Sequence, residues 1–523
     1  MTKTINYPVG IQTFSEIIRN DYLYVDKTAL VYKLVKDAKY IFLSRPRRFG
    51  KSLLMSTLEA YYKGSKDLFE HLKIWNLEKE WLKYPVFRFD LSGVNFNDIS
   101  KFISRINRCL KEIAEDYSLV LDGDNIADSF RSLIRQAYRK FDRGVVILVD
   151  EYDKPMLDTI HLDELHDHVK EELRGFYSVI KLSDEYVKKA VIIGVTRFSR
   201  VSIFSGFNNL KDISMLPIYN GICGITASEF KKDFEKSVYE FAQTNSMTED
   251  KVWEIFKKEY DGYHFAFPGE FIYNPFSVLT AFDNEIPGQY WFDSGSPSFL
   301  IKLVKNRNYL LGNLEGARRD ARKLNDIETI KHDLIPLLYQ AGYLTLLSYD
   351  TNAKEYILGF PNREVYEGFW GSLAGYFFRN PYGESSFDIN KFLDNIYRGQ
   401  PDKFMIRLRA LFADTESDHE PNKEIHFQTM MAIACKMMGL HVATEIHSAM
   451  GRCDMTIETT RFIYIFEFKV NSTPEIAMAQ IINKGYATRF AADTRTIFLI
   501  GANFSTHTRT LTQPWLIQTL SRQ

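Results

Sequence analysis

Residues 45–52 read R-P-R-R-F-G-K-S and carry the clearest chemical signal in the first half of the chain. They follow the apolar run YIFLS and precede the helical pattern LLMSTLEAYY. In this context a glycine lets the backbone approach a phosphate, a lysine reaches the β- and γ-phosphates, and a serine hydroxyl can ligate Mg²⁺. The loop differs from G-x-x-x-x-G-K-[ST] because an arginine stands at the first glycine. A basic turn that caps a helix by chance is the alternative. The predicted Walker A residues that bind nucleotide are Arg45, Arg48, Phe49, Gly50, Lys51 and Ser52.

Two further strand ends supply groups that such a site needs. The run VVILVDE (145–151) has the form of a Walker B strand, in which Asp150 could hold Mg²⁺ and Glu151 could orient or activate the attacking water. A solvated acidic turn is the alternative. GVTR (194–197) closes the next expected strand, where Thr196 or Arg197 could contact the γ-phosphate; for Arg197, a surface arginine at a strand end is an equal alternative. Together, the three segments predict binding of Mg²⁺ and ATP, with hydrolysis.

A second group of charged residues lies in the strand pattern FIYIFEFKV (462–470). Because strand side chains alternate between faces, Ile463, Ile465, Glu467 and Lys469 share one face. A buried charge requires a partner, a metal or a function. Asp454 precedes Glu467 by twelve intervening residues, and D-x12-E-x-K suits a Mg²⁺-dependent phosphodiesterase. The two carboxylates would hold the metal and the lysine would position water; a Glu–Lys pair near a strand edge is the alternative.

Residues that flank this cluster are weaker candidates. Arg452 could clamp a phosphate, and Gln480 could contact water or phosphate, although a plain surface glutamine is equally compatible. Lys484 and Tyr486 could touch a nucleic-acid backbone, and Glu424 could be a further metal ligand or a partner of a helix dipole. The three nearby histidines lack metal-ligand spacing and are interpreted as structural: His426, His441 and His447.

The elements that must position these residues can be read from hydrophobic periodicity. Apolar runs predict buried parallel strands at 40–43, 84–91, 144–151 and 189–196. From about 225 to about 372 the pattern is helical, with a capping box at Thr226 and Glu229 and a small hairpin formed by 343–349 and 356–360. The polar stretch 413–424 is the best linker. Beyond it we expect a helix over 425–440, three strands, a helix from Pro474 to about Ala491 and a last strand over 495–504.

These elements predict an α/β protein with three regions. We expect a P-loop NTPase parallel sheet over 1–222, a mostly helical region over 223–412 and a compact α/β unit over 413–523. The length of 523 residues agrees with several domains of about 100–200 residues.

Composition limits the partners. The 66 Lys and Arg residues balance 67 Asp and Glu residues, so no bulk field attracts nucleic acid, and any DNA binding must come from a local face. The four cysteines show neither zinc spacing nor a disulfide framework. No apolar run approaches the ~18 residues of a membrane span, so a cytoplasmic protein without a membrane partner is expected.

Several segments, taken together, resemble a bacterial family in which an AAA-ATPase-like domain is joined to a C-terminal PD-(D/E)XK nuclease-like domain. The matching segments are YVDKT (24–28), SRPRRFGKS (44–52), LVDEYDKP (148–155), GVTRFS (194–199), YDGYHF (260–265), YNPFSVL (273–279), GRCD (451–454) and EFK (467–469).

The resemblance implies Mg²⁺-ATP at the first site, a restriction-endonuclease-like fold with Mg²⁺ at the second, and DNA as the partner. It also implies that the arginine at the first glycine position is this family's own variant. The middle residues Tyr263, His264, Asn274, Pro275 and Phe276 would belong to a helical lid or winged-helix-like region and are interpreted as packing. A nucleotide-dependent switch whose nuclease-like domain only binds nucleic acid or protein remains the alternative. AAA-type relatives often form rings, but no residue here decides whether the chain forms a homo-oligomer.

Overall fold

The computed structural model divides the chain into two compact units, which are described separately. Unit 1 comprises Met1–Ser294 and Ala317–Val365, and unit 2 comprises Gly295–Gly316 and Tyr366–Gln523. The residues that the structure describes are 5–94, 96–160, 162–197, 204, 209–293, 314–325, 333–377, 389–413, 430, 433, 434, 436, 441–448, 451–508 and 510–520.

Unit 1 is built on a five-stranded parallel sheet of order β2-β3-β4-β1-β5. The strands are β1 (Tyr40–Ser44), β2 (Val86–Asp90), β3 (Val145–Asp150), β4 (Val187–Gly194) and β5 (Lys211–Asp212). The four strands expected from apolar runs are confirmed, and most of their residues are buried. The two-residue β5 had no such run to signal it. Because all five strands run parallel, their carboxyl ends meet at one edge, where the phosphate loop, Asp150 and Thr196 were predicted.

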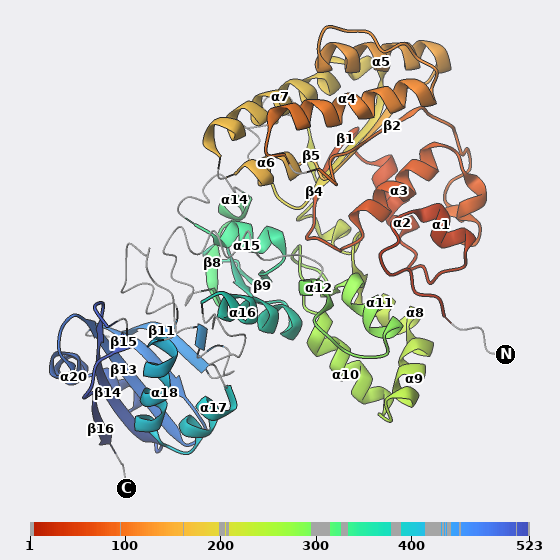
Figure 1. The fold of residues 1–523 in the computed structure, drawn as a ribbon. Helices are drawn as coiled ribbons and strands as arrows, with labels where there is room; N and C mark the ends of the chain where they lie inside the picture. The colour runs from red at the N-terminus through yellow and green to blue at the C-terminus, as the bar shows by residue number, and fades with distance from the viewer. Residues whose placement is uncertain are drawn as a thin grey trace. The chain divides into compact units, whose positions relative to one another are not determined.

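Helices cover both faces of this sheet. In Figure 1, α4 (Ile99–Asp116), α5 (Ile126–Phe141) and α7 (Asp163–Leu182) lie on one side, and α1 (Phe14–Arg19), α2 (Thr28–Lys36) and α3 (Lys51–Tyr62) lie on the other. The short α6 (Lys154–Thr159) follows β3 directly. Side-chain caps start α4 and α5: Asp98 accepts from the N–H of Ser100, and Asn125 accepts from the N–H of Asp128.

The remainder of unit 1 is mostly helical, as expected. The capping box of α8 is present: the Thr226 hydroxyl accepts from the N–H of Glu229, whose carboxylate accepts from the N–H of Thr226. The hairpin expected from 343–349 and 356–360 is present as β9 and β10, in a three-stranded sheet of order β8-β10-β9. The elements are β6 (Ile225–Thr226), α8 (Ala227–Asp233), α9 (Glu235–Thr244), α10 (Glu249–Tyr260), β7 (Ile272–Tyr273), α11 (Pro275–Asp283), α12 (Tyr290–Asp293), β8 (Ala317–Arg319), α14 (Ala321–Leu324), α15 (Ile335–Ala341), β9 (Thr345–Asp350) and β10 (Glu355–Gly359).

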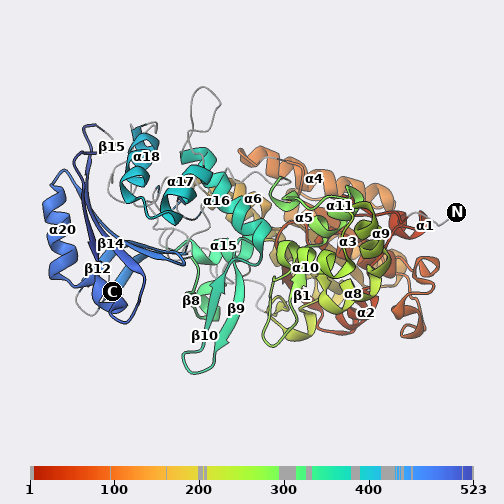
Figure 2. The ribbon, with the colours of Figure 1, turned by 90° about the horizontal axis from the view of Figure 1, so that it is seen from below.

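Unit 2 contains a six-stranded mixed sheet in which β13 runs parallel to β14. Its path is β11-β12-β13-β14-β15, with β16 also paired to β14. The strands are β11 (His441–Ser448), β12 (Gly451–Glu458), β13 (Phe462–Val470), β14 (Thr496–Ser505), β15 (Thr510–Leu511) and β16 (Leu516–Leu520). Figure 2 shows α20 (Pro474–Asn483) on one face, and α17 (Ile389–Tyr397) and α18 (Pro401–Ala413) on the other.

Two sequence expectations differ from the described structure of this region. The range 223–412 groups α17 and α18 with the middle region, but both pack on the C-terminal sheet: the Tyr464 hydroxyl donates to the Ile396 carbonyl, and the Trp515 indole donates to Asp402. The helix from Pro474 ends at Asn483, not near Ala491, because Gly485 adopts a left-handed φ of 61°. The helix expected over 425–440 and the linker lie largely outside the described residues.

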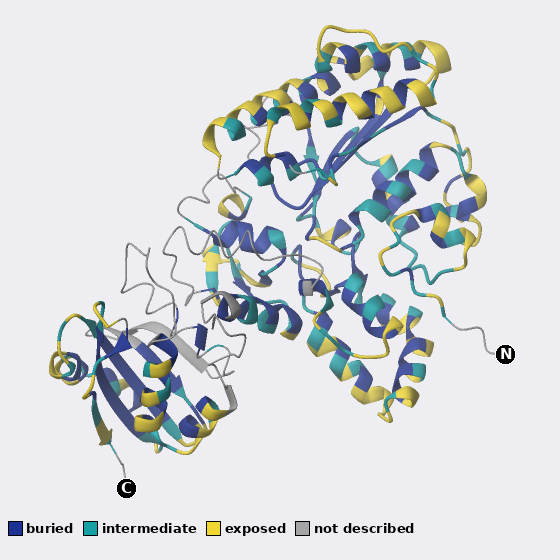
Figure 3. Ribbon diagram, viewed as in Figure 1, coloured by how far each residue is buried: buried dark blue, intermediate teal, exposed yellow. Residues whose placement is uncertain are grey.

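Burial follows the two sheets. In Figure 3 the central strands of both sheets are dark blue, while the outer sides of the helices carry much of the yellow. A second core in unit 1 packs α8 to α11 around Phe230, Phe256 and Phe282. Over the residues that can be described, none of the helices is both long and apolar enough to cross a bilayer.

Candidate functional site

The phosphate loop joins β1 to α3, and its shape depends on Gly50. This residue is the N-cap of α3 with a left-handed φ of 86°, a conformation that side chains disfavour. Lys51 is only 6 % exposed, and its Nζ reaches back to donate to the Pro46 carbonyl at 2.8 Å. The lysine ammonium therefore lies over the loop, at the N-terminus of a 12-residue helix, where N–H groups favour an anion.

Arg45 does not line the loop in the way that the sequence motif suggested. It is 1 % exposed, and its guanidinium donates to the carbonyls of Ser44 at 2.9 Å, Ser214 at 2.8 Å and Tyr219 at 3.0 Å. The guanidinium carbon also lies 4.3 Å from the centre of the Phe265 ring. These contacts give Arg45 a structural role, because its two NH2 groups hold protein carbonyls and fix the start of the loop. Contact of Arg45 with nucleotide stays a prediction.

The next bulky loop residues are also held by the helical part of unit 1. Phe49 is fully buried, with its ring centre 4.7 Å from that of Tyr263 and 5.4 Å from that of Phe265. Arg48 has a left-handed φ of 64° and stacks 4.7 Å above Phe276. The aromatic residues of the middle region, expected to act in packing, therefore pack against the phosphate loop itself.

The remaining loop residues complete this contact. The Trp291 indole donates to the Arg47 carbonyl at 3.1 Å. A Cβ on Gly342 would lie 2.6 Å from the side chain of Pro46, so the turn after α15 packs directly against the phosphate loop. Each residue from 45 to 49 is thus in contact with the segment 219–343.

Strand β3 ends at Asp150, and a second carboxylate, Glu151, follows it directly. Asp150 is buried and accepts from the N–H of Glu151 at 3.0 Å, and Glu151 has a left-handed φ of 50°. Parallel pairing places Asp90, the last residue of β2, level with Asp150. Sequence reasoning missed Asp90, although an aspartate that closes the run YPVFRFD was the same kind of signal. Three acidic side chains therefore lie at this edge of the sheet.

Burial and charge shift the ionisation of this group. Burial lowers the pKa of Lys51, against the opposing effect of Asp150 and Glu151. Burial raises the pKa of Asp150, while a hydrogen bond from Ser52 and the charge of Lys51 oppose the rise. Burial also raises the pKa of Glu151, with Lys51 opposing and Asp150 adding to the effect. A buried carboxylate with a raised pKa in a candidate site is typical of a general base.

Thr196 and Arg197 lie at the carboxyl end of β4, but their polar groups are engaged within the protein. The Thr196 hydroxyl donates to Asp153 at 2.5 Å. Arg197 forms an ion pair with Asp212 and donates to the side chain of Asn325. Both side chains therefore have protein partners, and contact of either residue with a γ-phosphate stays a prediction.

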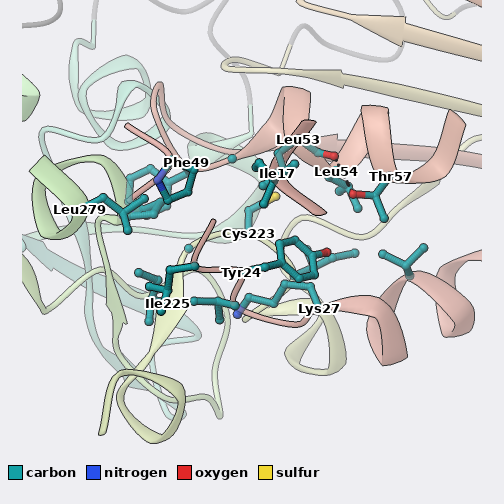
Figure 4. Close-up of a pocket in the computed structure, with 18 residues that line it drawn as sticks. Ile17, Tyr24, Lys27, Phe49, Leu53, Leu54, Thr57, Cys223, Ile225 and Leu279 are labelled. Atoms are coloured by element: carbon teal, nitrogen blue, oxygen red, sulfur yellow. Dashed lines mark hydrogen bonds between the residues drawn. The ribbon is translucent and has the colours of Figure 1, made fainter. Parts of the chain in front are cut away.

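A pocket opens beside the loop (Figure 4). Its walls come from the N-terminal segment 8–31, from the loop and α3, from 222–225 and from α11. Figure 4 shows Tyr24 and Lys27 across the pocket from Leu53 and Leu54. Most of the lining is apolar, and the Lys27 ammonium is paired with Glu229. Such a pocket suits a flat, uncharged group better than a phosphate.

The side-chain oxygens near the loop suit a Mg²⁺ ion that phosphate and water also ligate. Among the described residues, no three His, Cys, Asp or Glu side chains cluster as a metal cage. Mg²⁺ in phosphate sites is usually held by one or two protein oxygens together with phosphate and water. The Ser52 hydroxyl and the Asp150 carboxylate meet that need, since both lie beside Lys51 at the phosphate loop.

In unit 2, Glu467 and Lys469 adjoin on β13. Glu467 is 1 % exposed, and Lys469 Nζ donates to its Oε1 at 2.8 Å while remaining 25 % exposed. The register pairs Met455 with Phe466, so one step further along the antiparallel ladder Asp454 reaches the level of Glu467. The side chain of Asp454 lies outside the described residues. Asp454 and Glu467 are thus the next residues beyond the Met455–Phe466 pair, and their joint binding of a metal stays a prediction.

A glycine that the sequence reading did not single out lets α20 approach this position. Gly501 on β14 pairs with Glu467, and a Cβ on Gly501 would lie 2.7 Å from the amide nitrogen of Met478 and 2.8 Å from the Pro474 carbonyl. A side chain there would push α20 away from the sheet beside the buried carboxylate. A glycine inside a strand pattern was the available signal.

The candidate residues that flank Glu467 in the sequence do not all contact its carboxylate in the described structure. The Gln480 amide donates to the Tyr486 hydroxyl at 3.0 Å, which ties α20 to the following turn. Lys484 is exposed at the end of α20. The side chains of two further candidates, Glu424 and Arg452, lie outside the described residues, as do those of the three histidines interpreted as structural, His426, His441 and His447.

Comparisons with known proteins match both halves of the chain. A family profile described as "Predicted AAA-ATPase" matches residues 8–204, and one described as "PD-(D/E)XK nuclease superfamily" matches residues 422–514. A protein of Azotobacter chroococcum mcd 1, named "Uncharacterized protein in vnfD 5'region", is 33 % identical over 517 residues, which cover 96 % of this chain and 97 % of that protein. Because the first profile spans the parallel sheet with the phosphate loop and the second spans the sheet with Glu467 and Lys469, the chain belongs to the family that joins a predicted AAA-ATPase domain to a PD-(D/E)XK nuclease superfamily domain.

Proposed function

We propose that the chain binds and hydrolyses ATP with Mg²⁺ in unit 1, and that its nucleotide state controls Mg²⁺-dependent cleavage of DNA by unit 2. The observation that carries the first part is Lys51, whose buried ammonium rests on the Pro46 carbonyl within hydrogen-bond distance. Within the described part of the chain, the hydrogen bond of this ammonium is to a neutral carbonyl oxygen, a weaker acceptor than the phosphate oxygens that could replace it.

The pocket beside the loop supports a nucleotide over a bare phosphate. It shares Phe49, Gly50 and Leu53 with the phosphate loop and α3, so a base bound there would remain within one nucleotide's reach of Lys51. We therefore propose that the base packs on this apolar lining while the phosphates meet the N-terminus of α3.

The chain's own residues then have distinct tasks in hydrolysis. Lys51 binds the transferring phosphate, and Ser52 and Asp150 would hold Mg²⁺, which neutralises developing charge when bound. Glu151 orients the attacking water and accepts its proton, a role that its raised pKa favours near neutral pH.

In unit 2, Asp454 and Glu467 would hold the metal. The Lys469 ammonium, already 2.8 Å from Glu467, would orient water or stabilise charge on the phosphate. Arg452 and the exposed Lys484 would bind the DNA backbone, and such binding weakens with salt. The other candidate function is a switch whose nuclease-like unit only binds nucleic acid or protein.

A cleavage assay on the full chain separates these functions. Purified protein with Mg²⁺ or Mn²⁺ is given plasmid, linear and single-stranded DNA, and RNA, with and without ATP. We expect Asp454→Ala and Lys469→Ala to abolish cleavage and leave ATP hydrolysis intact, whereas Lys51→Ala abolishes hydrolysis and removes the effect of ATP on cleavage.

Two lysines of the same chain serve as controls. Lys63 ends α3 on the surface and pairs with Glu59, and Lys403 is exposed on α18. Lys63→Ala should leave hydrolysis unchanged, and Lys403→Ala should leave cleavage unchanged. If no substrate is cut with either metal, the nuclease function is rejected in favour of the switch. If Lys51→Ala binds nucleotide as tightly as the wild type, the phosphate site is misassigned.

A further inference from the structure

The carboxylate of Asp153 joins two strand ends at the nucleotide edge of unit 1. It is 1 % exposed and accepts from the N–H of Val195 at 3.1 Å, from the N–H of Thr196 at 2.6 Å and from the Thr196 hydroxyl at 2.5 Å. Asp153 follows β3 and Thr196 follows β4. The turn after the predicted Walker B strand is therefore fastened to the end of the neighbouring strand by a buried carboxylate.

The same turn is fastened at a second residue. The Tyr152 hydroxyl donates to the Thr196 carbonyl at 2.9 Å, and the Tyr152 N–H donates to the Ile193 carbonyl at 3.2 Å. Both Tyr152 and Asp153 are buried. These contacts reach the two residues that directly follow Glu151.

Packing around Gly194 is tight. A Cβ on Gly194 would lie 2.3 Å from Asp153 Oδ1 and 2.6 Å from the Tyr152 ring. The absence of a side chain on Gly194 is thus what allows the carboxylate and the ring to lie against β4.

Glu151 depends on this fastening because its backbone is in an unfavourable conformation. Its φ of 50° lies in the left-handed region, which non-glycine residues disfavour and which persists only where neighbours enforce it. On one side its N–H donates to Asp150, and on the other its carbonyl accepts from the N–H of Lys154. Asp153 and Tyr152 hold the rest of the turn.

We propose that Asp153 is a positioning residue for ATP hydrolysis, which holds Glu151 in place by fastening the β3–α6 turn to Val195 and Thr196. The inference rests on the proposed ATPase function. It gives Thr196 a different task from phosphate sensing: its hydroxyl and N–H are the donors that retain Asp153.

The expected effect falls on turnover more than on binding. A displacement of about 1 Å at a catalytic group can lower the rate by about 100-fold. Asp153 lies in the turn with Glu151, whereas affinity depends on the phosphate loop and the pocket. We therefore expect Asp153→Asn to lower kcat for ATP about 10- to 100-fold while the Kd for nucleotide changes less than about threefold.

The amide of Asp153→Asn keeps the shape of the side chain but offers one acceptor and an NH2 group to three donors. Thr196→Val removes only the hydroxyl donor, so it should lower kcat less than Asp153→Asn, and Thr196→Ser, which keeps the hydroxyl, should lower kcat least. The control is Asp158→Asn, which breaks the ion pair with Lys154 in the same α6 without touching Thr196. It should leave kcat near that of the wild type.

Full-length wild type and Lys51→Ala are measured first, because loss of turnover in Lys51→Ala establishes the ATPase function independently of Asp153. If the wild type hydrolyses no ATP under any condition, the ATPase function fails and the inference fails with it. If the wild type is active, the inference is overturned when Asp153→Asn keeps kcat, or when Thr196→Val and Thr196→Ser lower kcat equally. Should Asp153→Asn lack a cooperative thermal transition, the Thr196 pair decides alone.

Discussion

Replacing Arg45 by glycine would restore the first glycine of G-x-x-x-x-G-K-[ST], and the structure predicts that this change harms the protein. The guanidinium of Arg45 donates to the carbonyls of Ser44, Ser214 and Tyr219 in a site from which water is excluded. Burial lowers the pKa of this guanidinium to about 10, so the side chain is still charged at neutral pH. Removal would leave main-chain acceptors without their charged donor.

The magnitude follows from those contacts. A hydrogen bond to a charged group contributes about 1.5–3 kcal/mol, and a buried acceptor left without its donor costs about 1–3 kcal/mol. Arg45→Ala leaves three carbonyl acceptors without their donor, so we expect it to lower the free energy of unfolding of unit 1 by about 3–5 kcal/mol. The free energy of unfolding of Arg45→Gly should be lower than that of Arg45→Ala by up to about 1 kcal/mol, because glycine loses more backbone entropy on folding.

The assay is thermal and urea unfolding of the full chain, with the transition of unit 1 identified by its shift on addition of nucleotide. The matched control is Arg47→Ala, since Arg47 is exposed on the same loop and its carbonyl, which the variant keeps, accepts from the Trp291 indole. It should change stability by less than about 0.5 kcal/mol. If Arg45→Gly is as stable as the wild type, or binds nucleotide more tightly without loss of stability, the structural role assigned to Arg45 is refuted.

Three other predictions test separate contacts. Hydrolysis needs ionised Glu151, and burial raises the pKa of this carboxyl above its ordinary value of 4.5. As the pH is lowered, kcat should therefore begin to fall at a pH above 4.5. A pH profile in which kcat falls only at 4.5 or below would contradict this role of Glu151. Gly194→Ala would place a Cβ 2.3 Å from Asp153 Oδ1, so overpacking should cost about 1–3 kcal/mol and lower turnover, measured by unfolding and ATPase assays. Lys469→Met removes the ammonium that donates to buried Glu467, so it should abolish cleavage and destabilise unit 2 by about 1–3 kcal/mol. This loss is smaller than that for a fully buried ion pair because Lys469 is partly exposed to solvent.

Gly194→Ala and Lys469→Met each have a matched control variant. Gly175 lies in α7 with open space at its Cβ position, so Gly175→Ala should be neutral or stabilise by about 0.5–1 kcal/mol, in contrast to Gly194→Ala. Lys403→Met replaces an exposed lysine on α18 and should leave cleavage and stability unchanged. Equal effects within either pair would show that the loss does not arise from the contact described.

Local patterns in the sequence were sufficient for most elements of the sheets. Buried apolar runs predicted β1 to β4, and the alternation in β13 predicted that Glu467 and Lys469 share a face, as their hydrogen bond requires. Such patterns record burial and backbone pairing residue by residue. They did not reveal β5, which has only two residues, or the end of α20 at Gly485.

The partners of each side chain depended on contacts between segments far apart in the chain. From the sequence, Arg45 was a loop arginine near phosphate; the fold brings Ser214 and Tyr219 to its guanidinium. Likewise Asp90 became part of the acidic edge only because β2 pairs with β3.

The sequence by itself determined which residues could do chemistry: a glycine-lysine-serine turn between a strand and a helix, a carboxylate pair after a buried strand, and Glu467 with Lys469 on one strand face. These depend on spacing of a few residues, which fixes local geometry. The tertiary structure alone decided which of them are engaged. Strand order places Asp153 against Thr196, more than 40 residues away, because the free energy of such contacts arises from burial and pairing that no local spacing encodes.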